Sequence, residues 1–338
     1  MRAAFGFGFG LPLGDSGDAP AIDWNFAGGV MPSALTFSRA STATYYNAAG
    51  ALVTAASGSP RLTYDPVTHA ALGLLVEEQS TNLLLNSLLD GTNLSTQSVT
   101  VAATPYTLSF YGTGQIVLSG SATATVVGTG AFPTQKTYTF TPSAGSLTLT
   151  VTGTVQFAQL EAGAFAALAT SYIPTDAASA TRAADVVTCT GAAFSQWFNP
   201  SEGTLVVEVV MPNANLGPAA VLNLVYVGDG PGNEYIKVYQ YETVFGAAIR
   251  HSGAWQADVS GTKTAGAVEK LAVAWAANDA AVAIRGALVG TDATVSVPTG
   301  IDRLTLGTGY SGAVACTIKR LRYWRKRITN AQLQALTA

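Results

Sequence analysis

Residues 234–242 read EYIKVYQYE, and this stretch indicates the kind of fold that the chain adopts. Hydrophobic and polar side chains alternate along it, which is the period-two pattern of a β-strand with two different faces. The alternation recurs through the last half of the chain, bounded by Gly, Pro, Asn or Ser. The runs include GTLVVEVVM (203–211), AAVLNLVYVG (219–228), VFGAAIRHS (244–252), EKLAVAWAAND (269–279), AVAIRGALVG (281–290) and TIKRLRYWR (317–325). This spacing predicts a two-sheet sandwich of the jelly-roll type over residues 186–338.

Residues 91–160 form a second β-rich region of different composition. Their one charged side chain is Lys136, and threonines alternate with apolar residues in runs such as SLTLTVTG (146–153). Threonine suits the wet face of a strand because its branched Cβ fits the pleat. We expect a small Thr-rich β-sandwich over residues 89–163, the alternative being a disordered, mucin-like stalk. Residues 164–185 lack alternation and are predicted to be a linker.

Composition limits the function classes that fit this chain. Of its 338 residues 48% are apolar, only 11% are charged, and the net charge is −3. So small a charge favours neither nucleic acid nor membrane as a partner, and no apolar run reaches the roughly 18 residues of a membrane span. The two cysteines, Cys189 and Cys316, lie far apart without CxxC spacing, so we expect buried free thiols rather than a zinc site.

Helical signals are few. The last stretch, TNAQLQALTA (329–338), has Thr329 or Asn330 as the candidate N-cap and Leu333 and Leu336 on one face. A second candidate is LLVEEQSTNLLL (74–85). The fold class predicted for the whole chain is mainly β.

Catalytic signals are weak. GDSG (14–17) resembles a protease nucleophile loop, but only a Gly/Phe-rich tail precedes it, so a turn is the better interpretation. Glu202 and Glu208 share one predicted strand, but they lie too far apart along it to act readily as a glycosidase pair. No E-x-D-x-x-E pattern occurs. We therefore expect no enzyme activity, no catalytic residues, no cofactor and no metal, a glycan depolymerase remaining the alternative.

The densest charge lies in KRLRYWRKR (319–327), which holds six basic residues. Three interpretations are open: a nucleic-acid site, a solvated edge strand whose charges oppose aggregation, and an attraction for acidic surface polysaccharide. The acidic pI of about 5.4 and the absence of a second basic patch place nucleic acid last.

Sugar-binding sites combine an aromatic ring for stacking with polar groups that reach the hydroxyls. The aromatic residues nearest to predicted loops, with polar neighbours, are Tyr235, Tyr239, Trp255 and Tyr310. Trp255 is the first choice because it follows a Ser-Gly turn, with packing on the sheet as the alternative. Asp229 in VGDGPGNE could hold calcium, although a plain turn fits better.

One segment carries a family resemblance. FSRASTATYYNAAGALVTAASGSPRLTYDPVTHAALGLLVEEQSTNLLLNS (37–87) closely resembles a module of tailed-phage virion proteins described as head spikes, head fibres or tail fibres. The family pattern is F-x-R-A-S-x-A-T-Y, a Gly turn, P-R-x-x-Y-D-P and G-L-L-x-E-x-x-x-T-N-L-L. SYIPT (171–175) and TRAAD (181–185) also match the family, with a small insertion near residue 167. The last segment is similar, in pattern more than identity, to laminin-G or concanavalin-like lectin domains.

The resemblance implies a virion protein that attaches to host surface glycan. It further implies a homo-oligomer, expected to be a trimer, and a spike module of irregular and β structure over residues 21–88. Within this module Arg39 and Arg61 are isolated cations. We expect each guanidinium to form several hydrogen bonds, to a carboxylate or to loop carbonyls, and so to hold irregular segments of the chain in place. A structural decoration protein without a ligand is the alternative.

The first 20 residues are predicted to attach the chain to other virion proteins. The start, MRAAFGFGFGLPLG, loosely resembles a signal peptide, but the Gly/Phe alternation and Pro12 disfavour one. Alternation places Phe5, Phe7 and Phe9 on one face and glycines on the other, so a second backbone could approach closely.

Overall fold

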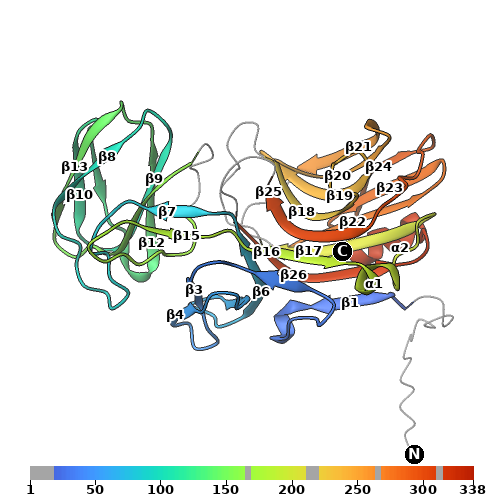
Figure 1. Cartoon of the computed structure of the whole chain (residues 1–338), viewed down its shortest axis with the longest axis horizontal. Coiled ribbons are helices and arrows are strands. Elements are labelled where there is room, and N and C mark those ends of the chain that lie inside the picture. Colours follow the sequence, from blue (N-terminus) through green and yellow to red (C-terminus); the bar gives the residue numbers. More distant parts are fainter. Residues whose placement is uncertain (1–18, 164–168, 211–220, 263–267, 310–314) are drawn as a thin grey trace, which may run out of the picture.

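The computed structural model describes residues 19–163, 169–210, 221–262, 268–309 and 315–338, and its regular structure is almost entirely β-strand. The predicted mainly-β class is confirmed. Two sandwiches lie at opposite ends of the long axis, with the β3–β4 hairpin (Ala43–Tyr46 and Leu52–Ala55) beneath the region between them (Figure 1). The predicted turn at 14–17, the phenylalanines of the tail and Tyr310 lie outside the described residues.

The larger sandwich consists of an eight-stranded and a seven-stranded sheet. The eight-stranded sheet runs in the order β24 (Ala287–Asp292), β23 (Asp279–Ile284), β22 (Val268–Ala276), β17 (Gly203–Val210), β26 (Ala315–Trp324), β6 (Ala71–Glu77) and β5 (Arg61–Tyr64), with β1 (Ile22–Asn25) also paired to β26. The seven-stranded sheet runs in the order β2 (Thr36–Ser38), β16 (Val186–Thr190), β25 (Arg303–Gly309), β18 (Val221–Gly228), β19 (Tyr235–Tyr241), β20 (Val244–His251) and β21 (Ala254–Thr262).

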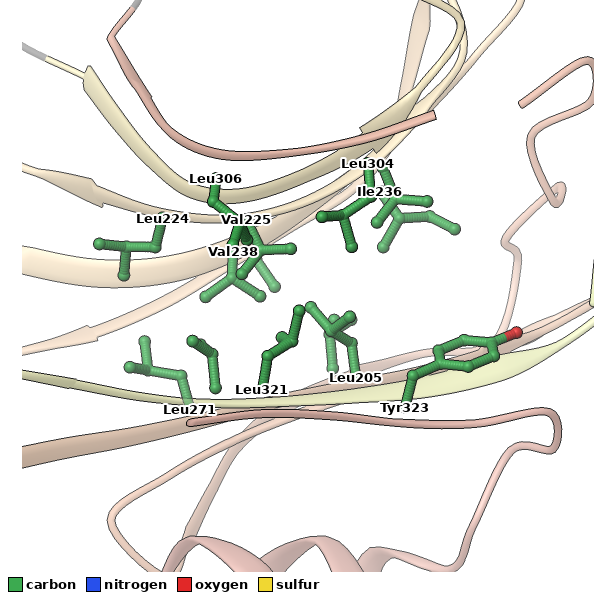
Figure 2. Close-up of a cluster of buried hydrophobic side chains, with 14 of the residues drawn as sticks. Leu205, Leu224, Val225, Ile236, Val238, Leu271, Leu304, Leu306, Leu321 and Tyr323 are labelled. Atoms are coloured by element: carbon green, nitrogen blue, oxygen red, sulfur yellow. The ribbon is translucent and has the colours of Figure 1, made fainter. Parts of the chain in front are cut away.

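The apolar side chains of the alternating sequence pattern fill the space between these two sheets. Figure 2 shows Leu205, Leu321 and Tyr323 of the eight-stranded sheet facing side chains such as Ile236 and Val238 of the seven-stranded sheet. Alternate residues of the central strands are thereby removed from water, which stabilises the fold by roughly 25 cal/mol per Å² of apolar surface. The two cysteines are buried in this core as free thiols, as predicted, and burial raises the pKa of Cys316 to about 12.

The C-terminal helix packs on the outer face of the eight-stranded sheet. Helix α2 (Asn330–Thr337) begins after Thr329, whose Oγ1 accepts a hydrogen bond from the Gln332 amide at 3.3 Å while the Gln332 side chain accepts one from the Thr329 amide at 2.9 Å. This reciprocal capping confirms the predicted helix start. Leu333 of the helix packs on small side chains of β22 and β23, namely Ala272, Ala274, Ala281 and Ala283. The other helices are short: η1 (Phe26–Gly28) and α1 (Ala192–Ser195).

The Thr-rich region forms the smaller sandwich, which confirms the predicted fold and contradicts a disordered stalk. One sheet has the order β11 (Ala124–Val127), β10 (Gln115–Gly120), β13 (Gly145–Thr152) and β8 (Gln97–Val101). The other has the order β12 (Gly130–Phe140), β9 (Tyr106–Gly112), β14 (Gln156–Ala162), β7 (Ser80–Asn82) and β15 (Ala180–Arg182). Leu108, Phe110, Ile116 and Leu149 are among the side chains of its core.

Sheet pairing crosses the predicted domain boundaries. Within residues 21–88, strands β1, β5 and β6 belong to the eight-stranded sheet, β2 to the seven-stranded sheet and β7 to the small sandwich. The linker supplies β15, which pairs with β7. With the β3–β4 hairpin as a sheet of its own, residues 21–88 therefore contribute strands to four sheets of the molecule.

Two of the local interpretations left open by the sequence are wrong. Residues 74–85 are not a helix: β6 pairs with β5 and β26, and Leu74 and Val76 are buried in the core, so tertiary pairing overrides the local pattern. The basic segment is not an edge strand, because β26 has β17 on one side and both β1 and β6 on the other.

The arginines of the basic segment are held by contacts within the molecule. Arg320 pairs with Asp23, Arg322 with Glu208 at 3.3 Å, and Arg327 with Asp279 at 2.9 Å. Arg325 donates to main-chain carbonyls, including that of Trp197 at 3.0 Å. Each of these four cations thus has a partner in the sandwich itself.

A buried ion network joins the sandwiches. Arg61 Nη1 lies 2.6 Å from Glu77 Oε2, and Arg61 Nη2 lies 2.5 Å from Asp185 Oδ2. Arg39 reaches the other oxygen of Asp185 at 3.0 Å, and Arg182 reaches Glu77 at 3.3 Å. All five side chains are 1% exposed or less. Dissolved salt therefore screens the attraction between these buried charges only weakly.

The same arginines also bind main-chain carbonyls in and around the β3–β4 hairpin. Arg39 donates to the carbonyl of Ser41 at 2.9 Å and to that of Ala56 at 2.8 Å, and Arg61 donates to the carbonyl of Thr44 at 3.0 Å. The structural role predicted for Arg39 and Arg61 is confirmed. Asp185 and Arg182 are partners that the sequence did not reveal.

We predict that Arg61→Met lowers the free energy of unfolding by about 3–5 kcal/mol, because Glu77 and Asp185 would lose the cation that compensates their burial. Arg320→Met is the matched control: its pair with Asp23 is 36% and 37% exposed, and we expect a loss of about 0–1 kcal/mol. Urea unfolding of both variants measures the difference. Equal losses would contradict the role of the network.

A second prediction concerns acid. The neighbouring Arg182 and Arg61 guanidinium groups and hydrogen bonds from Ser171 outweigh burial and lower the pKa of Glu77 from 4.5 to about 2. A lowered folded-state pKa stabilises the fold above the unfolded-state pKa, and this contribution is lost as the pH falls from 4.5 toward 2. We expect Glu77→Gln to lose less stability over this window than the wild type does. Parallel profiles of unfolding free energy against pH would contradict the prediction.

Candidate functional site

The outer face of the seven-stranded sheet carries a pocket of about 610 Å³. Strands β18, β19, β20, β21 and β25 form its floor, and the turn after β18 forms part of its rim. The lining residues are Val221, Asn223, Tyr226, Gly230, Pro231, Gly232, Tyr235, Lys237, Arg250, Trp255, Arg303 and Thr305. Aromatic, amide, hydroxyl and cationic side chains thus converge on one hollow.

Strand register explains why these side chains meet. One cross-strand row passes from Arg303 through Gly228, Tyr235 and Arg250 to Trp255. The next row passes from Thr305 through Tyr226, Lys237 and Ala248 to Asp258. Directly opposite residues of antiparallel strands have Cβ atoms only about 5 Å apart, so each row is continuous.

Small residues keep this floor hollow. A Cβ atom on Gly228 would lie 2.4 Å from the Tyr226 ring, and one on Gly246 would lie 2.7 Å from the Tyr239 ring. The tyrosine rings therefore lie flat over bare backbone instead of standing up from the sheet. Tyr239 is accordingly only 8% exposed although it is on the outer face, and its neighbour Tyr235, packed between the rings of Tyr226 and Trp255, is 5% exposed.

Trp255 stands above this floor because of a tight turn. Ser252 and Gly253 both have positive φ, 50° and 73°, which is the conformation of a two-residue hairpin turn that joins β20 to β21. The turn and a register shift beyond it place Trp255 opposite Arg250. Its ring meets the edge of Tyr235 at 6.0 Å, and the residue remains 55% exposed.

Two buried polar atoms of the pocket wall have no hydrogen-bond partner among the described residues. They are the hydroxyl of Tyr226 and Oδ1 of Asn223. Burial raises the pKa of Tyr226 to about 12, so its hydroxyl keeps its proton and can both donate and accept. A buried polar group without a partner costs about 1–3 kcal/mol, so both atoms are suited to bind a polar ligand.

The predicted site residues are partly brought together. Trp255 and Tyr235 line the pocket side by side, whereas Tyr239 lies beside them and donates its hydroxyl hydrogen to Asp258. Asp229 accepts a hydrogen bond from the Gly232 amide at 2.8 Å, as in the plain turn that we favoured. The described residues contain no cluster of three or more His, Cys, Asp or Glu side chains that could hold a metal ion.

Sequence analysis missed Tyr226, Lys237 and Arg250. Lys237 lies between Tyr235 and Tyr239, and strict alternation places all three on one face of β19. Arg250 and Trp255 flank the Ser252–Gly253 turn, so a hairpin register would have paired them. Tyr226 could not be assigned because its place depends on pairing between β18 and β25, which are 74 or more residues apart in the chain.

A second hollow, of about 640 Å³, lies near Trp24, Trp197 and Trp324. These tryptophans are only 8%, 3% and 5% exposed, and Trp24 packs edge-on against Trp197 at 6.0 Å. Their rings are used for packing, so this hollow offers little aromatic face to a ligand. The pocket beside Trp255 is the better candidate site.

The two carboxylates considered for catalysis are engaged elsewhere. Glu202 accepts a hydrogen bond from the Arg327 amide at 2.9 Å, and Glu208 pairs with Arg322 on the other sheet from the pocket. No described helix is both long and apolar enough to cross a membrane.

No family model and no curated protein matches the chain. Among solved structures, the CBM40 domain of Ruminococcus gnavus IT-sialidase bound to α2,3-sialyllactose aligns at 18% identity and a TM-score of 0.36, over 43% of this chain and 87% of that one. A structure of botulinum neurotoxin type C aligns at 12% identity and a TM-score of 0.37, over 45% of this chain and 39% of that one. Its description states that cell entry of the toxin depends on interaction with two ganglioside molecules. With similarity this low, nothing about the ligand of this chain follows from these structures.

The geometry of the pocket predicts the fluorescence of the protein. Trp255 is 55% exposed, whereas the other four tryptophans, Trp24, Trp197, Trp275 and Trp324, are at most 8% exposed. A collisional quencher in the solvent should therefore reduce the fluorescence of Trp255 almost exclusively. The Trp255→Phe substitution should remove most of the quenchable fluorescence. Because Lys237 Nζ and Arg250 Cζ lie 5.7 and 5.8 Å from the ring centroid, the ratio of iodide quenching to caesium quenching should be higher for Trp255 than for a free tryptophan amide at equal ionic strength. The same ratio for the protein and the free amide would contradict this description of the local charge.

Proposed function

We propose that the chain is a carbohydrate-binding protein whose site is the pocket beside Trp255. The observation that carries the proposal is an exposed tryptophan above a hollow whose walls hold buried polar atoms that have no hydrogen-bond partner among the residues that the structure describes. A pyranose ring has apolar C–H faces and a rim of hydroxyls. It would stack on the indole while its hydroxyls supply hydrogen bonds to Tyr226 and Asn223.

The binding test compares Trp255→Ala with Tyr241→Ala on a glycan array and on host-type cells. Tyr241 is the matched control, because it is an aromatic residue on the same face of β19, 36% exposed and outside the pocket. We expect Trp255→Ala to weaken saccharide binding at least ~10-fold, equivalent to about 1.4 kcal/mol, and Tyr241→Ala to leave it unchanged. Unchanged binding by a folded Trp255→Ala protein would refute the site.

The proposal extends to attachment of a phage virion to host surface glycan, on the strength of the sequence resemblance over residues 37–87. In that role residues 1–20 would join other virion proteins, and a homotrimer would raise weak affinity per site to useful avidity. Light scattering measures the molar mass of the protein in solution directly, and this mass gives the number of chains in the oligomer. A monomer at the concentrations that support cell binding would contradict the trimer.

We further propose that binding occurs without hydrolysis. Incubating the protein with the polysaccharides that it binds should release no reducing ends, and their release would point to a depolymerase. A decoration protein without a ligand would bind no glycan and would show no effect of Trp255→Ala.

A further inference from the structure

The pocket holds more positive charge than a neutral sugar requires. Lys237, Arg250 and Arg303 all line it, whereas its described lining residues include no carboxylate. In a chain with only 11% charged residues, three cations around one hollow are a marked concentration. Their individual contacts show which of these charges are already compensated.

Lys237 is the least compensated of the three. Its ammonium lies 5.3 Å from the ring centroid of Tyr235, 5.0 Å from that of Tyr239 and 5.7 Å from that of Trp255. It makes no hydrogen bond or ion pair with any residue that the structure describes. Burial, together with the charge of Arg250, lowers the pKa of Lys237, and Asp258 offsets this only in part. An ammonium group in this setting is stabilised by an added anion.

Arg250 presents a free end to the same space. Its Nε donates to the carbonyl of Gly253 at 2.9 Å, which fixes the direction of the side chain, and its Cζ lies 5.8 Å from the Trp255 ring centroid. The two terminal nitrogens have no partner among the described residues. A guanidinium held in this way is suited to receive a carboxylate on two parallel N–H groups.

Arg303 differs from the other two cations. It binds Asp302 through two nitrogens, at 2.7 and 3.1 Å, so its charge is compensated at the rim. The uncompensated charge is therefore located at Lys237, two residues from Tyr235 on β19, and at Arg250, opposite Tyr235 on β20, and both cations lie next to Trp255.

Cation–π contacts alone do not account for this arrangement. Such a contact is an attraction between the cation and the face of the ring, and it requires no hydrogen-bond acceptor. It leaves the three N–H donors of Lys237 and the terminal donors of Arg250 unused. A ligand with an anionic oxygen would use both sets while its ring contacts the indole.

Building on the proposed saccharide site, we propose that the pocket selects sugars that carry a carboxylate, with Lys237 and Arg250 binding the carboxylate and Trp255 contacting the pyranose ring. Two sugar classes supply this chemistry, hexuronic acids and nonulosonic acids such as N-acetylneuraminic acid. The pocket volume of about 610 Å³ is large enough for a monosaccharide of either class.

The test uses the full chain and paired probes. Oligosaccharides ending in glucuronate, galacturonate or N-acetylneuraminate are compared with the same compounds after reduction of the carboxyl group to a hydroxymethyl group. We expect the wild type to bind at least one acidic probe at least ~10-fold more tightly than its reduced partner. The probe that binds distinguishes the two sugar classes.

Substitutions in the pocket test which residues produce the preference for the acidic probe. Lys237→Met and Arg250→Met should each reduce the ratio of acidic to reduced affinity toward one, while binding of the reduced probe persists. Lys237→Arg should retain most of the preference, which keeps the test decisive if Lys237→Met does not fold. Lys136→Met, which removes the one cation of the Thr-rich sequence between residues 91 and 160, is the control and should leave the ratio unchanged.

The outcomes separate this inference from the proposed function. Binding of acidic and reduced probes with equal affinity, still dependent on Trp255, would overturn the carboxylate preference and leave the saccharide site standing. A preference unaffected by both Met variants would also overturn it. Failure to bind any probe or array glycan would overturn both proposals.

Discussion

Arg61 forms ion pairs with Glu77 and Asp185 at the same time, in a region without access to solvent. Glu77 ends β6 of the eight-stranded sheet, and Asp185 directly precedes β16 of the seven-stranded sheet. Arg182, which also binds Glu77, ends β15 at the edge of the small sandwich. One cluster of charges thus joins segments of three sheets. Because a buried charge without a partner is costly, each arginine and carboxylate stabilises this arrangement over any in which they are separated.

The cluster explains the motif that opened the family resemblance. FSRAS, SPRLTYDP, GLLVEE and TRAAD each contribute one of its charges, namely Arg39, Arg61, Glu77, and Arg182 with Asp185. A chain with few charged residues places these five in its interior, where they fix irregular segments that have little hydrophobic core of their own. The motif is therefore a structural element, and the pocket lies elsewhere, on strands β18 to β21 and β25.

The pocket depends on the regularity of the sheet that carries it. Its aromatic and cationic side chains come from cross-strand rows, and their backbone positions are fixed by the strand pairs on either side. Gly228 and Gly246 leave room for the tyrosine rings to lie flat. A site built on strands is already ordered before a ligand arrives, so little conformational entropy is lost on binding.

Sequence patterns predicted local features well and long-range ones poorly. Alternation identified the strands, a Thr cap located the last helix, and a Ser-Gly turn pointed to Trp255. The partner of Arg39 lies 146 residues away, and no local pattern reports such a contact. The 74–85 segment was a candidate helix because its own residues allow one, whereas pairing with β26 decides its structure. Lys237 was within reach of the alternation rule, but its significance depends on Arg250 and Trp255 from neighbouring strands.

The most direct test of the account is an NMR titration that follows the five tryptophan indole N–H signals as a bound saccharide is added. The structure places one indole, that of Trp255, at the proposed pocket, and three others, those of Trp24, Trp197 and Trp324, around the second hollow. We predict that the Trp255 signal shifts in proportion to saturation while the signals of the other four tryptophans stay in place. Shifts of Trp24, Trp197 or Trp324 with an unmoved Trp255 would show that the protein binds its ligand somewhere else.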